Sequence, residues 1–157
     1  MDRAVTTRDS LRWRVYLRLM RLADVATQVV YRLSGGRLGE RQLAYSILLL
    51  HTVGRKTGRT RTHALLYIRD GDNFVVCASN FGSPRHPAWY LNLMVNPCAR
   101  IQAGQVETDV SARTAGPDER RELWPRFLAV RPQYAEYQAA TAREIPIVIL
   151  TPLSSSG

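Results

Sequence analysis

Residues 47–68 read ILLLHTVGRKTGRTRTHALLYI, with two apolar runs on either side of a short polar segment. The runs at 47–53 and 62–68 have the length of β-strands and are separated by a segment that contains glycine. Gly54 and Gly58 bracket this segment, and glycine permits a sharp turn. The stretch therefore predicts two antiparallel strands joined by a tight loop, around which the rest of the chain is expected to be organised.

The connecting segment, residues 54–61, is called the basic loop because Arg55, Lys56, Arg59 and Arg61 place four cations on it. Cations this close repel one another unless they spread into solvent or converge on an anion. Guanidinium and ammonium groups are well suited to phosphate or carboxylate oxygens. The loop matches neither the Walker motif nor the dinucleotide fingerprint. Two interpretations stay open: an anion clamp, and a solvated turn that is basic by composition.

The rest of the chain predicts further antiparallel strands. A turn signal at 69–72 reverses the chain into a third strand, and Gly104 centres another hairpin. The additional strands are expected at residues 73–79, 99–103, 106–115 and 145–150. About six antiparallel strands in one small domain tend to close, because closure removes exposed edges. We therefore expect an α+β fold built on a small antiparallel β-barrel.

Four helices are expected around these strands. Within residues 1–33, apolar residues at helical spacing and a separate arginine face predict a basic amphipathic helix from about Leu11 to Leu33. It is expected to cover the end of the sheet or to dock on a membrane surface. A second helix should run from Pro87 to about Asn96, with Asn92 bonding to backbone. A third should start near residue 117 and be interrupted or bent at Pro125, and a short fourth should carry two tyrosines.

Length and charge limit the possible functions. At 157 residues and 17.8 kDa the chain predicts a single domain, 1–157, with a frayed tail at 154–157. Its net charge of +9 favours an anionic partner. Cys77, expected to be buried, and Cys98 lack metal-binding spacing, the three histidines are scattered, and no targeting signal is evident. A cytoplasmic protein without a metal site is expected.

Several motifs, in the same order along the chain, resemble the deazaflavin-dependent nitroreductase family, within the split β-barrel flavin and deazaflavin oxidoreductases. The resemblance covers roughly residues 47–150, whereas the N-terminal helix matches only in character. The matching motifs are Gly54 to Gly58 with Arg61, residues 65–71, Ala78-Ser79, residues 87–93 with Asn96-Pro97, residues 134–137 and residues 145–148.

This resemblance implies a split β-barrel and a site for coenzyme F420 (8-hydroxy-5-deazaflavin). The cofactor's phosphate and glutamate tail would meet the basic loop, where Arg59 is an extra charge. Ser79 matches a position near the deazaflavin ring, and its hydroxyl would donate to a ring carbonyl or to substrate. The implied activity is hydride transfer from reduced F420 to a planar electrophile. The cofactor-binding positions so implied are Arg55, Lys56, Thr57, Gly58, Arg61, Tyr67 and Ser79.

Tyr134 and Tyr137, three residues apart on one helical face, are candidate catalytic residues together with Ser79. Their rings can line a pocket for a planar substrate, and a phenol can donate to developing charge on oxygen. The competing interpretation is a pair of core aromatic residues. Tyr67 is expected to point either into the barrel or toward the pocket, on the face opposite Leu66.

The chain also departs from the resemblance. Leu66 and Arg131 stand where some nitro-reducing relatives carry tyrosines, and Asn80-Phe81 replaces a lysine-glycine pair. A quinone or an α,β-unsaturated carbonyl is therefore expected in preference to a nitro compound. Arg131 is a candidate for recognising an acidic substrate, or is a surface arginine.

Two other functions remain open from sequence. One is an FMN-binding split-barrel oxidoreductase, since the same fold and phosphate clamp would serve FMN. The other is a non-catalytic basic binding module. Nucleic-acid binding is not expected, because the densest cations and the paired tyrosines fall on different elements. A homodimer and peripheral membrane contact are expected as accompanying features.

Overall fold

A computed structural model describes residues 46–153 and six single positions nearer the N-terminus, namely Val15, Arg18, Leu19, Leu22, Ala26 and Val30. Those six residues are helical and exposed. The rest of the expected N-terminal helix, and the expected tail at 154–157, lie outside the described residues. Among the helices of the described part, none is long and apolar enough to cross a membrane.

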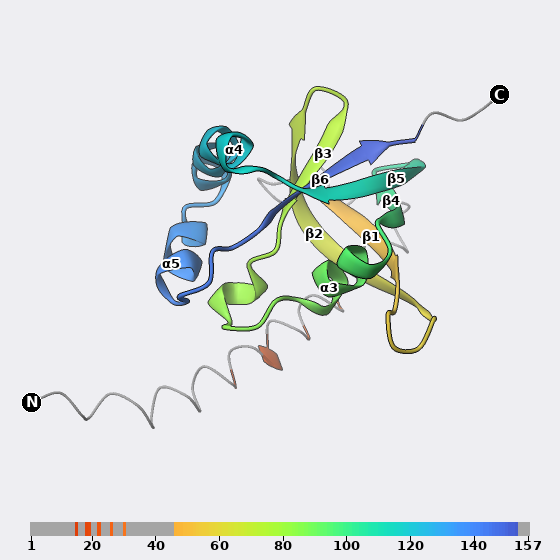
Figure 1. Cartoon of the computed structure of the whole chain (residues 1–157), viewed down its shortest axis with the longest axis horizontal. Helices are drawn as coiled ribbons and strands as arrows, with labels where there is room; N and C mark the ends of the chain where they lie inside the picture. Colours follow the sequence, from red (N-terminus) through yellow and green to blue (C-terminus); the bar gives the residue numbers. More distant parts are fainter. Residues whose placement is uncertain are drawn as a thin grey trace, which may run out of the picture.

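Six strands form a closed barrel in the order β1-β2-β3-β6-β5-β4, and every neighbouring pair is antiparallel (Figure 1). The expected small antiparallel barrel is therefore confirmed. The strands are β1 (Ile47–Val53), β2 (Thr60–Asp70), β3 (Asn73–Cys77), β4 (Cys98–Ala103), β5 (Val106–Thr114) and β6 (Ile147–Pro152).

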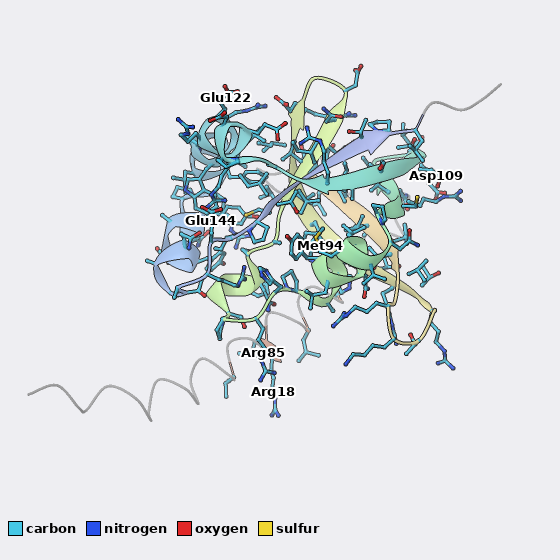
Figure 2. All side chains as sticks on the ribbon, viewed as in Figure 1. Arg18, Arg85, Met94, Asp109, Glu122 and Glu144 are labelled. Atoms are coloured by element: carbon cyan, nitrogen blue, oxygen red, sulfur yellow. The ribbon has the colours of Figure 1, made fainter. Side chains whose placement is uncertain are left out.

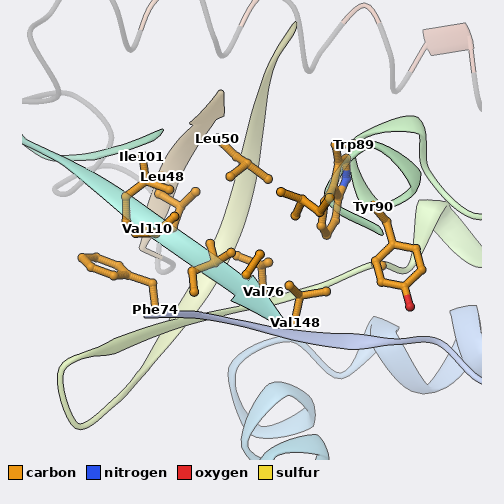
Figure 3. Packing of buried hydrophobic residues seen from close by; sticks show 13 residues of the cluster. Leu48, Leu50, Phe74, Val76, Trp89, Tyr90, Ile101, Val110 and Val148 are labelled. Carbon is orange, nitrogen blue, oxygen red and sulfur yellow. The ribbon is translucent and has the colours of Figure 1, made fainter. Parts of the chain in front are cut away.

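The barrel interior is filled by alternate residues of the strands. On β1, Leu48 and Leu50 point inward and are fully buried, as strand alternation requires. The helix α3 (Ala88–Val95) adds Trp89, Tyr90 and Leu93 to the same apolar cluster (Figure 3). This packing holds α3 against the end of β1, where the basic loop begins.

A second apolar cluster covers the outer face of β3 and β6. There α4 (Pro117–Val130) and α5 (Gln133–Ala139) pack together on one side of the barrel (Figure 1). Cys77 lies in this cluster, buried as expected, and burial raises the pKa of its thiol to about 12. The two clusters place α3 and the α4–α5 pair around different parts of the barrel.

Pro125 does not interrupt α4, so that part of the expectation is wrong. The helix buries Leu123 and Phe127 on either side of the proline, whereas Pro125 itself is exposed. Packing of the buried face therefore offsets the missing backbone hydrogen bond, which water can replace on the exposed face. The last strand also starts later than expected, at Ile147, because Pro146 lacks the N–H needed for the ladder.

Candidate functional site

The basic loop is a tight turn whose backbone is fixed by its own hydrogen bonds. Gly54 N–H donates to the Arg59 carbonyl at 2.8 Å, and Gly58 N–H donates to the Gly54 carbonyl at 2.7 Å. Gly58 has a φ of 66°, a left-handed conformation that favours glycine. A Cβ on Gly54 would lie 3.0 Å from Thr57 Oγ1 and 3.1 Å from the Arg59 carbonyl. The two glycines therefore determine the shape of the loop.

Asn92 of α3 attaches the loop to the body of the protein. Its Oδ1 accepts from the backbone N–H of Arg55 at 3.1 Å and from Arg55 Nη1 at 3.2 Å. Its Nδ2 donates to Thr52 Oγ1 at 3.1 Å, and both Asn92 and Thr52 are buried. The expectation that Asn92 bonds to backbone is confirmed, and its partner is the first cation of the loop.

All four cations of the basic loop are exposed, and the loop extends away from the barrel (Figure 2). Within residues 46–153 none of the four forms an ion pair with a carboxylate, unlike Arg100, Arg113, Arg120, Arg121 and Arg126. The loop therefore concentrates positive charge that the described part of the protein leaves uncompensated. Such a surface attracts a polyanion.

Ser79 lies two residues beyond the end of β3 at Cys77, so the strand is shorter than the expected 73–79, and Ser79 is half-buried. It starts a turn in which Asn80, Phe81 and Gly82 all have positive φ, at 45°, 54° and 73°. Such values are rare for residues other than glycine. Gly82 N–H donates to the Ser79 carbonyl at 3.0 Å, which closes the turn. The segment Ser79–Gly82 is called the left-handed turn below.

Arg143, which the sequence did not single out, holds this turn. Its Nε donates to the Ser83 carbonyl at 2.9 Å, and its Nη2 donates to the Ser79 carbonyl at 2.7 Å. Both terminal nitrogens also donate to the Ala78 carbonyl at 3.2 Å. No periodicity or motif marks Arg143, because its partners lie some sixty positions earlier in the chain.

Tyr134 and Tyr137 lie side by side in the second apolar cluster, with ring centroids 5.9 Å apart. Each of the two residues is 7 % exposed. The ring of Tyr137 also meets that of Phe81 in the left-handed turn, at 5.9 Å. Burial raises the pKa of Tyr134 far above its ordinary value, so its phenol stays protonated. The pair thus packs in a core while touching the turn that follows Ser79.

Tyr67 packs against the interior cluster, 5.3 Å from the ring of Phe74, while Leu66 packs against the outer one. The expected opposite orientation of these neighbours is confirmed. Tyr67 therefore faces the barrel interior and stays partly exposed. Arg131 donates through Nε to Gln133 Oε1 at 2.9 Å, near the start of α5.

Comparison with known proteins shows to which family this chain belongs. The family model "F420H(2)-dependent quinone reductase" matches residues 24–152. The chain belongs to this family. An F420H(2)-dependent quinone reductase of Mycobacterium tuberculosis is 40% identical over 150 residues, covering 91% of this chain and 98% of that protein.

Two solved structures are similar to this chain in fold and sequence. One is described as an F420-H2 dependent reductase, FDR-A, with 36% identity and a TM-score of 0.62 over 67% of this chain and 93% of that one. Another, described as a domain-swapped dimer, has 34% identity and a TM-score of 0.64, over 80% of this chain and 96% of that one. The split-barrel fold expected from the resemblance is thereby confirmed.

Proposed function

We propose that the protein catalyses the reduction of a quinone by reduced coenzyme F420. Its family supplies the enzyme class, an oxidoreductase, and the cofactor. One observation carries the assignment to this chain's own residues. The basic loop carries four exposed cations that have no carboxylate partner within residues 46–153, and Asn92 anchors this loop to the barrel.

The basic loop fits the anionic end of this cofactor. Arg55, Lys56 and Arg61 bind the phosphate, with the Thr57 hydroxyl as a further donor, and Arg59 meets the glutamate tail. Gly58 contributes through its positive φ, which gives the loop the shape that presents these groups. Because the loop backbone is held by Asn92 and by its own hydrogen bonds, little order has to be gained on binding. Charge-assisted hydrogen bonds to phosphate are the strong kind.

The ring end of the cofactor is proposed to lie beside Ser79, with Tyr67 contributing to its binding. When bound, reduced F420 supplies the hydride. Ser79 donates its hydroxyl proton in a hydrogen bond to a ring carbonyl or to the quinone oxygen. Tyr134 and Tyr137 form one wall of the substrate pocket, and their phenol O–H groups donate to the oxygen on which charge develops. The protein therefore positions and polarises the substrate.

The substrate class is proposed to be quinones first, with enones and nitro compounds as wider electrophiles.

Two further features are proposed for the surroundings of the enzyme. The solved relative described as a domain-swapped dimer supports self-association. Exposed Val15, Leu19 and Leu22, on helical residues next to exposed Arg18, support contact with an anionic membrane on its cytoplasmic side. Release of the protein from anionic vesicles on deletion of residues 1–46 would support that contact, and unchanged binding would oppose it.

Cofactor titration tests the main proposal. Wild type, Lys56→Ala and Arg121→Ala are titrated with oxidised F420 and separately with FMN, following cofactor fluorescence. Arg121 is an exposed cation on α4, at another side of the barrel, so its loss makes the same change of charge away from the basic loop and breaks only an exposed ion pair with Asp118 (Figure 1). F420 binding should weaken roughly tenfold in Lys56→Ala and stay near wild type in Arg121→Ala.

Activity is measured next, as quinone-dependent reoxidation of reduced F420. Preference for FMN over F420 would instead favour the FMN-binding oxidoreductase. Absence of binding to either cofactor would favour the non-catalytic basic module.

A further inference from the structure

The guanidinium of Arg143 is directed at one short segment of backbone. Its nitrogen atoms donate to the carbonyls of Ala78, Ser79 and Ser83, at 2.7 to 3.2 Å. The same group donates through Nη1 to His86 Nδ1 at 3.4 Å. Within residues 46–153 it has no carboxylate partner. A single side chain thus connects both ends of the connection between β3 and α3.

The segment that Arg143 holds is strained. Asn80 and Phe81 keep positive φ although neither is glycine, and such conformations persist only where surrounding structure enforces them. Asn80 Nδ2 donates to the Arg85 carbonyl at 2.9 Å. Gly82 packs so closely on α5 that a Cβ there would lie 2.7 Å from the Tyr137 carbonyl. Arg143 adds its hydrogen bonds to the carbonyls of Ala78, Ser79 and Ser83.

We propose that Arg143 is a positioning residue that locks the left-handed turn, and with it Ser79, in the conformation that receives the ring end of the cofactor. The inference rests on the proposed function for the role of Ser79. The locking itself depends only on the contacts of Arg143. Within residues 46–153 Arg143 donates no hydrogen bond to the basic loop or to its anchor Asn92, so we expect it to act on the ring end of the cofactor site and to leave the basic loop unchanged.

Lysine cannot replace this arginine. A guanidinium offers five donors in one plane, which match several carbonyls at once, whereas an ammonium offers three donors around one nitrogen. Burial lowers the pKa of Arg143, so holding a cation here is unfavourable unless its hydrogen bonds are made. A neutral or a shorter-reaching side chain at position 143 would release the turn.

His86 provides a direct reporter of the lock. Because Arg143 donates to Nδ1, the neutral imidazole carries its proton on Nε2. Burial, and then the charge of Arg143, lower the pKa of His86. The ring of Tyr90 also faces the imidazole, with the two ring centroids 5.0 Å apart. Removing the Arg143 charge should therefore raise the pKa of His86 and release its tautomer.

The test compares wild type with Arg143→Lys, Arg143→Met and Arg120→Lys. Arg120 is a matched control, because it is also a half-buried arginine that donates to a main-chain carbonyl, that of Ile145, but it does not contact the left-handed turn. Nitrogen-detected NMR of the cofactor-free proteins gives the His86 tautomer and pKa, and the amide shift of Gly82. Both Arg143 variants should shift Gly82, and Arg143→Met should also raise the His86 pKa, whereas Arg120→Lys should change neither.

Cofactor binding then tests the functional part. F420 is compared with its fragment that lacks the phosphate and glutamate tail. Arg143→Lys should weaken binding of the fragment and lower kcat, each by on the order of tenfold or more. Lys56→Ala should weaken F420 binding by the same factor in the Arg143→Lys background as in wild type. Arg143→Lys is the conservative variant and decides the outcome if Arg143→Met does not fold.

The possible failures are distinguishable. Unchanged NMR signals of Gly82 and His86 in both folded variants would show that Arg143 does not hold the left-handed turn. A shifted turn with unchanged fragment binding and kcat would overturn the positioning role. Absence of F420 binding in wild type would count against the proposed function and therefore against the role of Arg143 in cofactor binding. The NMR measurement would still show whether Arg143 holds the left-handed turn.

Discussion

Asn92 Oδ1 accepts two hydrogen bonds from Arg55, one from its backbone N–H at 3.1 Å and one from its guanidinium at 3.2 Å. A single buried amide on α3 therefore fixes both the backbone of the basic loop and the direction of its first cation. The amide is itself oriented by Thr52, at the end of the strand that leads into the loop. The geometry of the proposed phosphate clamp depends on this buried group.

Asn92→Ala should consequently weaken both the fold and the clamp. The substitution leaves the buried Thr52 hydroxyl and the Arg55 N–H without their partner, which costs about 1–3 kcal/mol of unfolding free energy. F420 affinity should fall by roughly tenfold, because the loop must then be ordered on binding. Urea denaturation and cofactor titration measure the two effects.

Tyr90→Phe is the matched control for Asn92→Ala. It removes a hydrogen bond of 3.1 Å to Thr114 Oγ1 from the same helix, without touching the loop. A loss of F420 affinity in Tyr90→Phe as large as that in Asn92→Ala would show that any damage to α3 is sufficient, and would contradict the specific role of Asn92.

Gly82→Ala should be more destabilising than Gly71→Ala. Both glycines have positive φ, 73° and 56°, so a new Cβ is unfavourable by about 1 kcal/mol at either position. Only at Gly82 would the Cβ also meet backbone, 2.7 Å from the Tyr137 carbonyl, whereas at Gly71 it would meet nothing within 4 Å. We expect Gly82→Ala to lose about 1–3 kcal/mol more in urea denaturation. Equal losses would mean that the turn does not pack on α5 as described.

Acid stability should depend on Glu119. Hydrogen bonds from Arg113, and then from the Gly116 N–H, lower the pKa of Glu119 to about 2 from an ordinary value of 4.5. A carboxyl group with a lower pKa in the folded chain stabilises the fold above its unfolded pKa, and this stabilisation is lost as the pH falls from 4.5 toward 2. Glu119→Gln should therefore lower Tm at pH 7 and flatten its fall in that range.

The control for Glu119→Gln is Glu122→Gln, which makes the same change of charge at an exposed position of the same helix. Its Tm should follow the wild-type pH dependence. A wild-type acid profile in Glu119→Gln itself would show that the start of α4 is not stabilised by this carboxylate.

The barrel was predictable from sequence because its signals are local. The bounds of β1 were predicted correctly, since the apolar run of residues 47–53 ends at Gly54. The basic loop is likewise marked by a local motif, because its glycines and cations are contiguous in the sequence. In contrast, the continuity of α4 through Pro125 depends on which helix face is buried, and propensity does not contain that information.

The contacts that shape the candidate site were less predictable because they join distant residues. Arg55 and Asn92 are 37 positions apart, and Arg143 and Ser79 are 64 apart. Such pairs meet only once the barrel has closed and placed the ends of β1 and β3 beside their partners. The sequence marked Ser79 through its motif, but nothing local marks the arginine that holds it.

The burial of Tyr134 and Tyr137 makes their proposed role in catalysis testable by single-atom changes. Replacing either with phenylalanine removes the phenol oxygen and preserves the ring, so the core packing stays nearly intact. If the phenols donate to substrate, Tyr134→Phe and Tyr137→Phe should each lower kcat of quinone reduction by about tenfold or more, with Tm almost unchanged.

Tyr90→Phe again serves as the control, because its ring lies in the other apolar cluster. Steady-state kinetics with reduced F420 and thermal melts of the three variants give the comparison. Wild-type kcat in both Tyr134→Phe and Tyr137→Phe would assign the pair to packing, and would leave Ser79 as the remaining candidate for polarising the substrate.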